Sequence, residues 1–172
     1  MDKETPRFNR RESGLAVPNN GKVTSEDIAA MFGIDLRERV LAKLRAFNFL
    51  PDGRELTFFG KGQAHNGSQA RYFVEERVAE HMVYVSFLGP NSQTSIHKHD
   101  EPIFESYFWL GGESFLRRDN DIHRLAQGQE VIRISSGSVH QLTTRENASL
   151  ALIVMENAAH VPADKLHIPA TL

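Results

Sequence analysis

The sequence contains no cysteine among its 172 residues. This absence excludes a disulfide framework, a thiolate metal site and catalysis by a thiol. Any metal ion that the chain binds must therefore be held by imidazole and carboxylate groups.

A strong net charge is also absent. The chain carries 20 lysine and arginine residues against 22 aspartate and glutamate residues, which gives a formal net charge of -2. A charge balance of this kind provides no bulk field that would attract nucleic acid or an anionic membrane. We therefore expect a small-molecule partner, neutral or modestly charged, rather than nucleic acid.

Long apolar runs are missing as well. No stretch approaches the roughly 20 apolar residues that span a bilayer, and the amino-terminal residues MDKETPRFNRRESG are polar. We therefore expect a cytoplasmic protein without a membrane partner.

Changes in composition divide the chain into three segments. Residues 1–23 mix charged residues, Asn, Gly and Pro without apolar periodicity, which predicts a flexible arm. Residues 24–55 have the pattern of a helical extension, with one short helix over residues 26–32 and a second helix after it. Residues 56–172 form the principal domain, with a tail at its carboxyl end.

The second helix is predicted to begin near Asp35. Leu36, Val40 and Leu44 recur from there at helical spacing and would form one apolar face. The turn-forming sequence at residues 51–53 predicts its end.

The principal domain is predicted to be mainly β. Short runs rich in Val, Ile, Phe, Tyr and Thr alternate with Gly, Pro, Asn and Asp, as in a sandwich or barrel. The nine expected strands cover residues 70–76, 81–88, 93–98, 105–110, 114–118, 123–125, 130–134, 140–144 and 150–156.

Four residues have the spacing of a metal site. His97 and His99 are two positions apart, so on a strand both rings lie on the same face. Glu105 follows after a turn that contains Pro102 and could lie beside them on the adjacent strand, and His140 offers a fourth ligand. We predict that the four residues hold one divalent ion, which could be Zn, Fe, Mn, Ni or Co, with positions left for water or substrate.

The order and spacing of these residues resemble the two motifs of the cupin superfamily. The first motif, Gly, His-x-His, Glu and Gly, is matched by His97, His99, Glu105 and Gly112, and the second is matched by Gly128, Gly137 and His140, with Ser135 at the position of the motif proline. The resemblance covers roughly residues 80–157. It implies a double-stranded β-helix (jelly-roll) barrel of the RmlC-like kind, in which these four residues bind the metal, and it also implies a homodimer.

Neighbouring side chains could complete the site. If Glu105 points into the barrel, strand alternation also turns Tyr107 and Trp109 inward, where they would either contact substrate or fill the core. On the preceding strand, alternation places either His81 or Tyr84 inward, and these two are the candidates for a catalytic proton-transfer group. Three further histidines have no partner at ligand spacing and lie outside the predicted site: His123, His160 and His167.

Three functions are compatible with these residues. The leading expectation is a metal-dependent isomerase or epimerase that acts on a sugar or a similar small polar molecule, as some cupins do. The second is a non-haem Fe(II) dioxygenase, because histidine and carboxylate ligands with open positions suit that chemistry. The third is a non-catalytic sensor, in which the barrel binds an effector and residues 25–35, which resemble the turn of a helix-turn-helix, act on another molecule.

Overall fold

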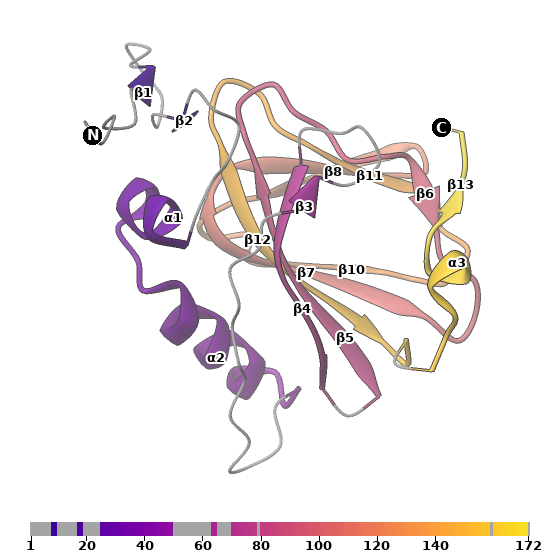
Figure 1. The fold of residues 1–172 in the computed structure, drawn as a ribbon. Coiled ribbons are helices and arrows are strands. Elements are labelled where there is room, and N and C mark those ends of the chain that lie inside the picture. Colours follow the sequence, from indigo (N-terminus) through magenta and orange to yellow (C-terminus); the bar gives the residue numbers. More distant parts are fainter. Residues whose placement is uncertain are drawn as a thin grey trace, which may run out of the picture.

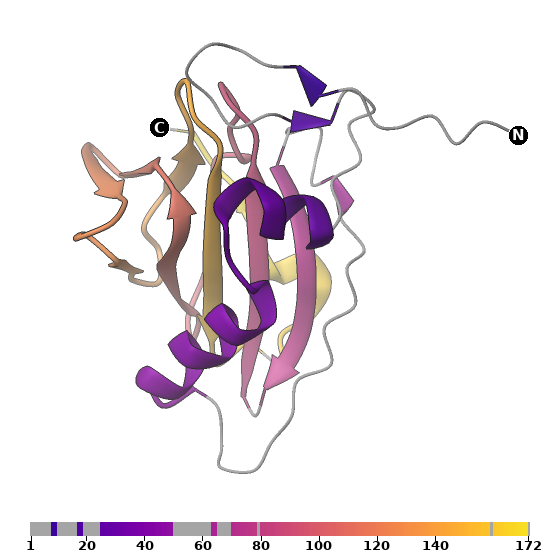
Figure 2. The same ribbon diagram turned by 90° about the vertical axis from the view of Figure 1, so that its left-hand side faces the viewer.

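The computed structural model describes residues 25–49, 70–78, 80–158 and 160–171, together with the two-residue strands β1 (Phe8–Asn9), β2 (Val17–Pro18) and β3 (Gln63–Ala64). Within these residues, two antiparallel sheets lie face to face, and two helices cover the outer side of the larger sheet (Figure 1; Figure 2). None of the helices described is both long enough and apolar enough to cross a membrane.

The larger sheet has six strands in the order β10-β7-β12-β5-β4-β3, and the smaller sheet has five in the order β13-β6-β11-β8-β9. All of these neighbours pair antiparallel. The strands after β3 are β4 (Ala70–Val78), β5 (His81–Leu88), β6 (His97–Lys98), β7 (Phe104–Gly112), β8 (Ser114–Arg118), β9 (Asp121–Leu125), β10 (Val131–Ile134), β11 (His140–Thr143), β12 (Ser149–Glu156) and β13 (Ile168–Pro169). A mainly β jelly-roll architecture is therefore confirmed.

The helices α1 (Ser25–Phe32) and α2 (Leu36–Ala46) are joined by a tight turn. Gly33 adopts a φ of +62° in this turn, a conformation that glycine reaches without steric cost. Asp35 then caps α2, because its carboxylate accepts a hydrogen bond from the backbone N–H of Glu38 at 3.0 Å.

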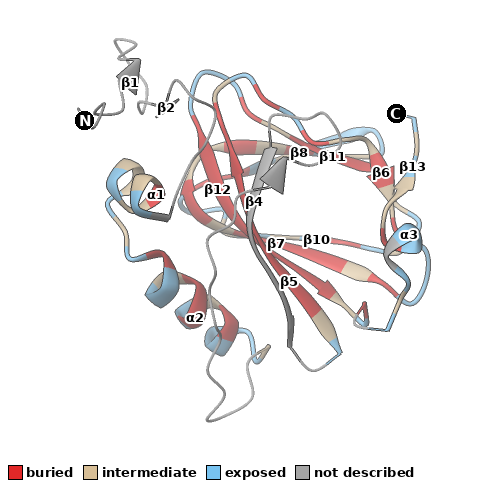
Figure 3. Ribbon diagram, viewed as in Figure 1, coloured by how far each residue is buried: buried red, intermediate tan, exposed pale blue. Residues whose placement is uncertain are grey.

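The strands β5, β7 and β12 of the six-stranded sheet are buried on both faces (Figure 3). Strand β5 illustrates the division: Val83 and Val85 pack against the helices, whereas Met82 and Tyr84 face the second sheet. From the helices, the outer core receives the buried residues Ile28, Leu36, Val40, Leu41 and Leu44. Burial on both faces explains why β5 and β12 are apolar almost throughout instead of alternating.

The nine expected strands agree with observed ones to within two residues at either end, except the third, at β6, and the two-residue strands β1, β2 and β3 are not predicted. The sequence predicts a strand over residues 93–98, but only His97–Lys98 forms one, and Gln93 makes an isolated bridge to Thr143. The tail also contains structure that its sequence does not predict, namely the short helix α3 (Ala163–Leu166) and β13. Most of the arm over residues 1–23 and the end of the helical extension lie outside the described residues, and the division into three segments stays a prediction.

Two glycines at the end of β7 allow close backbone packing. A Cβ added at Gly111 would lie 2.5 Å from Cδ1 of Phe32, so α1 approaches the sheet at this position. A Cβ at Gly112 would lie 2.0 Å from the carbonyl oxygen of Ala148, and Gly112 also has a φ of +69°. The register of β7 and β12 shifts close by, between Leu150 and Ala151.

We therefore expect Gly112→Ala to destabilise the fold more than Gly128→Ala. Gly128 has a φ of +87°, and no atom of the described residues lies within 4 Å of an added Cβ, so its substitution introduces backbone strain alone, about 1–2 kcal/mol. Gly112→Ala adds a clash with backbone, for a further loss of about 1–3 kcal/mol. Urea unfolding of both variants measures the difference, and equal losses would contradict the packing described for Gly112.

Candidate metal centre

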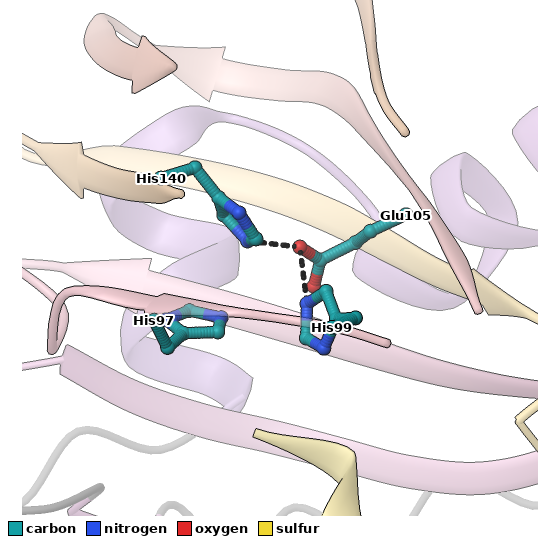
Figure 4. A group of neighbouring side chains, drawn as sticks. All are labelled: His97, His99, Glu105 and His140. Atoms are coloured by element: carbon teal, nitrogen blue, oxygen red, sulfur yellow. Dashed lines mark hydrogen bonds and ion pairs between the residues drawn. The ribbon is translucent and has the colours of Figure 1, made fainter. Parts of the chain in front are cut away.

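The four predicted ligands lie between the two sheets (Figure 4). His97 belongs to β6 and His140 to β11 of the smaller sheet, and the two residues are paired in register. His99 follows β6 directly, and Glu105 lies on β7 of the larger sheet. The pairing of β6 with β11 brings together histidines that are 43 positions apart. The carboxylate of Glu105 joins them because the larger sheet packs against the smaller one.

The group is compact and buried. One nitrogen or oxygen atom from each residue lies within 4.8 Å of the corresponding atoms of the other three. The exposed fractions are 4% for His97, 1% for His99, 2% for Glu105 and 0% for His140. Ionisable groups buried to this degree are costly unless each polar atom finds a partner.

The backbone fixes the orientation of all three rings. In each histidine, Nδ1 lies at hydrogen-bonding distance from a backbone carbonyl oxygen, and the pairs are His97 with Ser95 at 2.9 Å, His99 with Leu166 at 2.5 Å and His140 with Ser138 at 2.9 Å. A carbonyl oxygen can only accept, so Nδ1 must carry the proton and donate in each pair. The three Nε2 atoms are therefore left to face the centre of the group, the arrangement that outer partners impose on metal-binding histidines.

The carboxylate of Glu105 occupies one side of this centre. Figure 4 shows it directed between the rings of His99 and His140, with Oε2 at 3.1 Å from Nε2 of His99 and 2.7 Å from Nε2 of His140. Among the described residues, Nε2 of His97 is buried and has no hydrogen-bond partner. With every Nδ1 protonated, each Nε2 carries a lone pair that needs a donor or a cation, and the ionised carboxylate beside His99 and His140 cannot donate. One divalent ion satisfies all three nitrogens and the carboxylate at once, so these residues fit a metal.

The electrostatics of the group agree with this fit. Burial lowers the pKa of His97 from 6.5 to about 3, so this ring is neutral at ordinary pH, the form that binds a metal. Burial alone would raise the pKa of Glu105, but the charge and hydrogen bonds of His99 and His140 hold it well below its usual value of 4.5. The group therefore presents one neutral imidazole and one ionised carboxylate without any metal being needed to deprotonate them.

His99 behaves differently from His97. Burial would lower the pKa of His99, yet the charge and hydrogen bond of Glu105, together with the carbonyl of Leu166, raise it above 6.5. A proton on Nε2 of His99 and a metal ion therefore compete for the same place. The donor set of three nitrogens and one oxygen suits Zn, Fe, Mn, Ni or Co, and the choice among them stays a prediction.

The two aromatic residues predicted to bind substrate follow Glu105 at alternate positions of β7. Tyr107 is buried, and its ring meets that of His140 edge-on with centroids 6.2 Å apart. Trp109 is half-buried against the inner core, and its Nε1 donates to the carbonyl oxygen of Gly112 at 2.8 Å. The structure thus brings Tyr107 to the ligand group and places Trp109 further along the same strand.

Tyr84 shares the inner face with Tyr107. Tyr84 is paired with Ile153 of β12, and Ile153 is paired in turn with Tyr107. The two tyrosines therefore lie in one row across the sheet, with β12 between them. The hydroxyl of Tyr84 donates to Sδ of Met82 at 3.7 Å. A role for Tyr84 in proton transfer is compatible with this position and stays a prediction.

His81 lies on the opposite face of β5, next to the helices. Its ring is 5.4 Å from that of Phe49, and its Nδ1 accepts a hydrogen bond from the backbone N–H of Asn157 at 3.3 Å. Because side chains alternate along a strand, this face points away from the four ligands. The structure does not bring His81 to the candidate centre.

One residue that the sequence excluded from the site lies beside it. The ring of His167 is 4.9 Å from that of His97 and 5.2 Å from that of His99, measured between centroids. His167 stands between α3 and β13, and β13 pairs with β6. No sequence pattern indicates this contact, because His167 is about 70 positions from the first histidine pair and no motif connects the two.

No protein-family model matches the sequence, and neither does any curated protein. Solved structures do match the fold. An RmlC-like cupin from Shewanella frigidimarina has a TM-score of 0.51 at 13% identity, and covers 63% of this chain and 95% of its own. A cupin-like protein from Thermotoga maritima has a TM-score of 0.50 at 17% identity, with 63% of this chain and 85% of its own covered.

Other matches are to longer chains. AerE from Microcystis aeruginosa has a TM-score of 0.51 at 15% identity, with 64% of this chain covered but only 52% of its own. A structure of DMSP lyases has a TM-score of 0.48 at 17% identity, and this chain spans about half of its length, 53%. At these identities the likeness is one of fold. Two facing antiparallel sheets, with three histidines and a glutamate gathered between them at the cupin motif positions, show that the chain has the cupin fold.

Proposed function

We propose that the protein is a metal-dependent enzyme, of the isomerase or epimerase type, that acts on a sugar or another small polar molecule. The observation that carries the proposal is the gathering of donor atoms from three histidines and one carboxylate within 4.8 Å of one another, with each Nδ1 tied to a carbonyl oxygen. A structural role alone does not require three histidines with the same tautomer directed at one point. A single bound ion accounts for it, because outer partners that fix the tautomer are typical of metal-binding histidines.

A divalent ion at this point would polarise a carbonyl or hydroxyl oxygen of the substrate. The protein contributes the charge balance around it: Glu105 supplies one negative charge, and His97 is neutral. A dication with one carboxylate leaves a net positive centre, which favours an oxygen ligand with negative or partly negative charge. A metal that accepts more than four ligands, such as Fe, Mn, Ni or Co, would also keep coordination positions open beside the four protein donors.

Isomerisation and epimerisation also need a group that moves a proton. Tyr84 is our candidate because it lies on the inner face, in the same row as Tyr107. We assign Tyr107 and Trp109 to the substrate, since both lie along the inner face beyond Glu105. His81 has no part in this proposal, because its ring lies on the helix side of β5.

The donor set also favours a second candidate, a non-haem Fe(II) dioxygenase. The two enzymes differ in metal and in oxygen use, although their ligands are the same. A sensor role for the barrel is a third possibility, but the apolar residues of α1 and α2 are used to pack on the six-stranded sheet. This packing gives the two helices a structural task that requires no other molecule.

His97→Ala should abolish stoichiometric metal binding while the domain stays folded. The substitution removes one of four donors, so we expect the Kd for Zn²⁺ or Co²⁺ to rise by more than the roughly 10- to 100-fold that loss of an outer partner causes. Elemental analysis and titration measure the change, with circular dichroism as the test of folding.

His160→Ala is the matched control, because His160 is exposed and forms an ion pair with Glu80 at 3.0 Å, away from the ligand group. Glu105→Gln, which keeps the size of the side chain, should also lose the ion. Metal content that stays at the wild-type level in folded His97→Ala protein would refute the ligand assignment.

A substrate screen run with and without oxygen distinguishes the isomerase from the dioxygenase. We expect turnover of a polar carbonyl or sugar substrate under nitrogen by protein loaded with Mn, Co or Zn, because isomerisation consumes no oxidant. Product formation is followed by chromatography, and oxygen uptake by an electrode. Turnover that requires Fe(II) and consumes oxygen in step with product would favour the dioxygenase instead.

A further inference from the structure

The carboxyl-terminal segment is attached to the strand that carries the histidine pair. Strand β13 pairs with β6 so that Pro169 lies opposite His97, and the backbone N–H of Ala170 donates to the carbonyl oxygen of Ile96 at 3.3 Å. Figure 1 shows α3 and β13 beside β6, on the side of the molecule away from α1 and α2. The segment is therefore one edge of the smaller sheet.

Leu166 also holds the carboxyl-terminal segment in place, through contacts with the inner core and with His99. Its side chain is 5% exposed and belongs to the core between the sheets. Its carbonyl oxygen accepts the hydrogen bond from Nδ1 of His99. The tautomer of one predicted ligand thus depends on a backbone group 67 positions further along the chain.

His167 lies between these two attachments. Because Leu166 is fixed on one side and β13 on the other, the backbone of His167 has little freedom to move the ring away from His97 and His99. The ring is half-buried, whereas the four predicted ligands are buried. His167 is thus a partly exposed ring beside the buried ligands.

His167 does not belong to the group of predicted metal ligands. The compact group of donor atoms within 4.8 Å of one another contains His97, His99, Glu105 and His140 but not His167. Its ring centre is nevertheless about 5 Å from the rings of His97 and His99. These distances join ring centroids, and they place the imidazole of His167 next to the two histidines that a molecule bound to the ion would also approach.

On the basis of the metal site in the proposed function, we propose that His167 is a positioning residue that orients an exogenous oxygen ligand, such as a carboxylate, on the metal ion. The net positive centre attracts the oxygen ligand, and the imidazole of His167 supplies a hydrogen bond at the solvent side of it. The chemical class that the site accepts is then a small molecule with an anionic oxygen.

The test uses the full-length protein loaded with Co²⁺ and acetate as the probe. Acetate is titrated while the visible absorption of the cobalt is recorded, so binding is measured without any catalytic assay. His167→Phe keeps an aromatic ring but has no nitrogen, whereas His167→Gln keeps a hydrogen-bonding group without the ring.

We expect one Co²⁺ per chain in both variants, a Kd for acetate about tenfold higher in His167→Phe, and a Kd close to that of the wild type in His167→Gln. His160→Ala, from the same region of the chain, should match the wild type. Wild-type acetate affinity in His167→Phe would overturn the proposal and leave the ring with a packing role only. Failure of the wild-type protein to bind Co²⁺ would instead refute the proposed metal site, so the two failures are distinguishable.

Discussion

The candidate centre depends on the three hydrogen bonds that tie Nδ1 of each histidine to a backbone carbonyl oxygen. These bonds decide which nitrogen carries the proton, and therefore which nitrogen is free to face Glu105. Two of the carbonyls belong to the residue two positions before the histidine, so local chain conformation is sufficient for His97 and His140. The third belongs to Leu166, so His99 has its orientation only when the carboxyl-terminal segment is in place.

The two sheets contribute different parts of the centre. The smaller sheet supplies the imidazoles, because β6 and β11 are paired with His97 opposite His140. The larger sheet supplies the carboxylate through β7, whose next inward residue is Tyr107. This division means that the packing of one sheet on the other determines the distance between nitrogen and oxygen donors, so the inner core has a direct effect on the chemistry.

Much of this arrangement follows from sequence patterns that are local. The spacing of His97 and His99, the position of Glu105 and the turn before His140 predict the ligand group, and the strand boundaries are close to those observed. Local patterns do not show which side of β5 faces the second sheet. A strand that is buried on both faces has no polar face that would identify its solvent side. Local patterns also do not reveal His167, whose place depends on the pairing of β13 with β6.

Burial on both faces has a consequence for how the chain folds during synthesis. Strands β5 and β12 are apolar on either side, and an uncovered face of this kind would adhere to other unfolded chains. The residues that cover the outer face, in α1 and α2, precede both strands in the chain. The protective layer therefore leaves the ribosome before the surface that it protects, and the period in which that surface is open to aggregation is shortened.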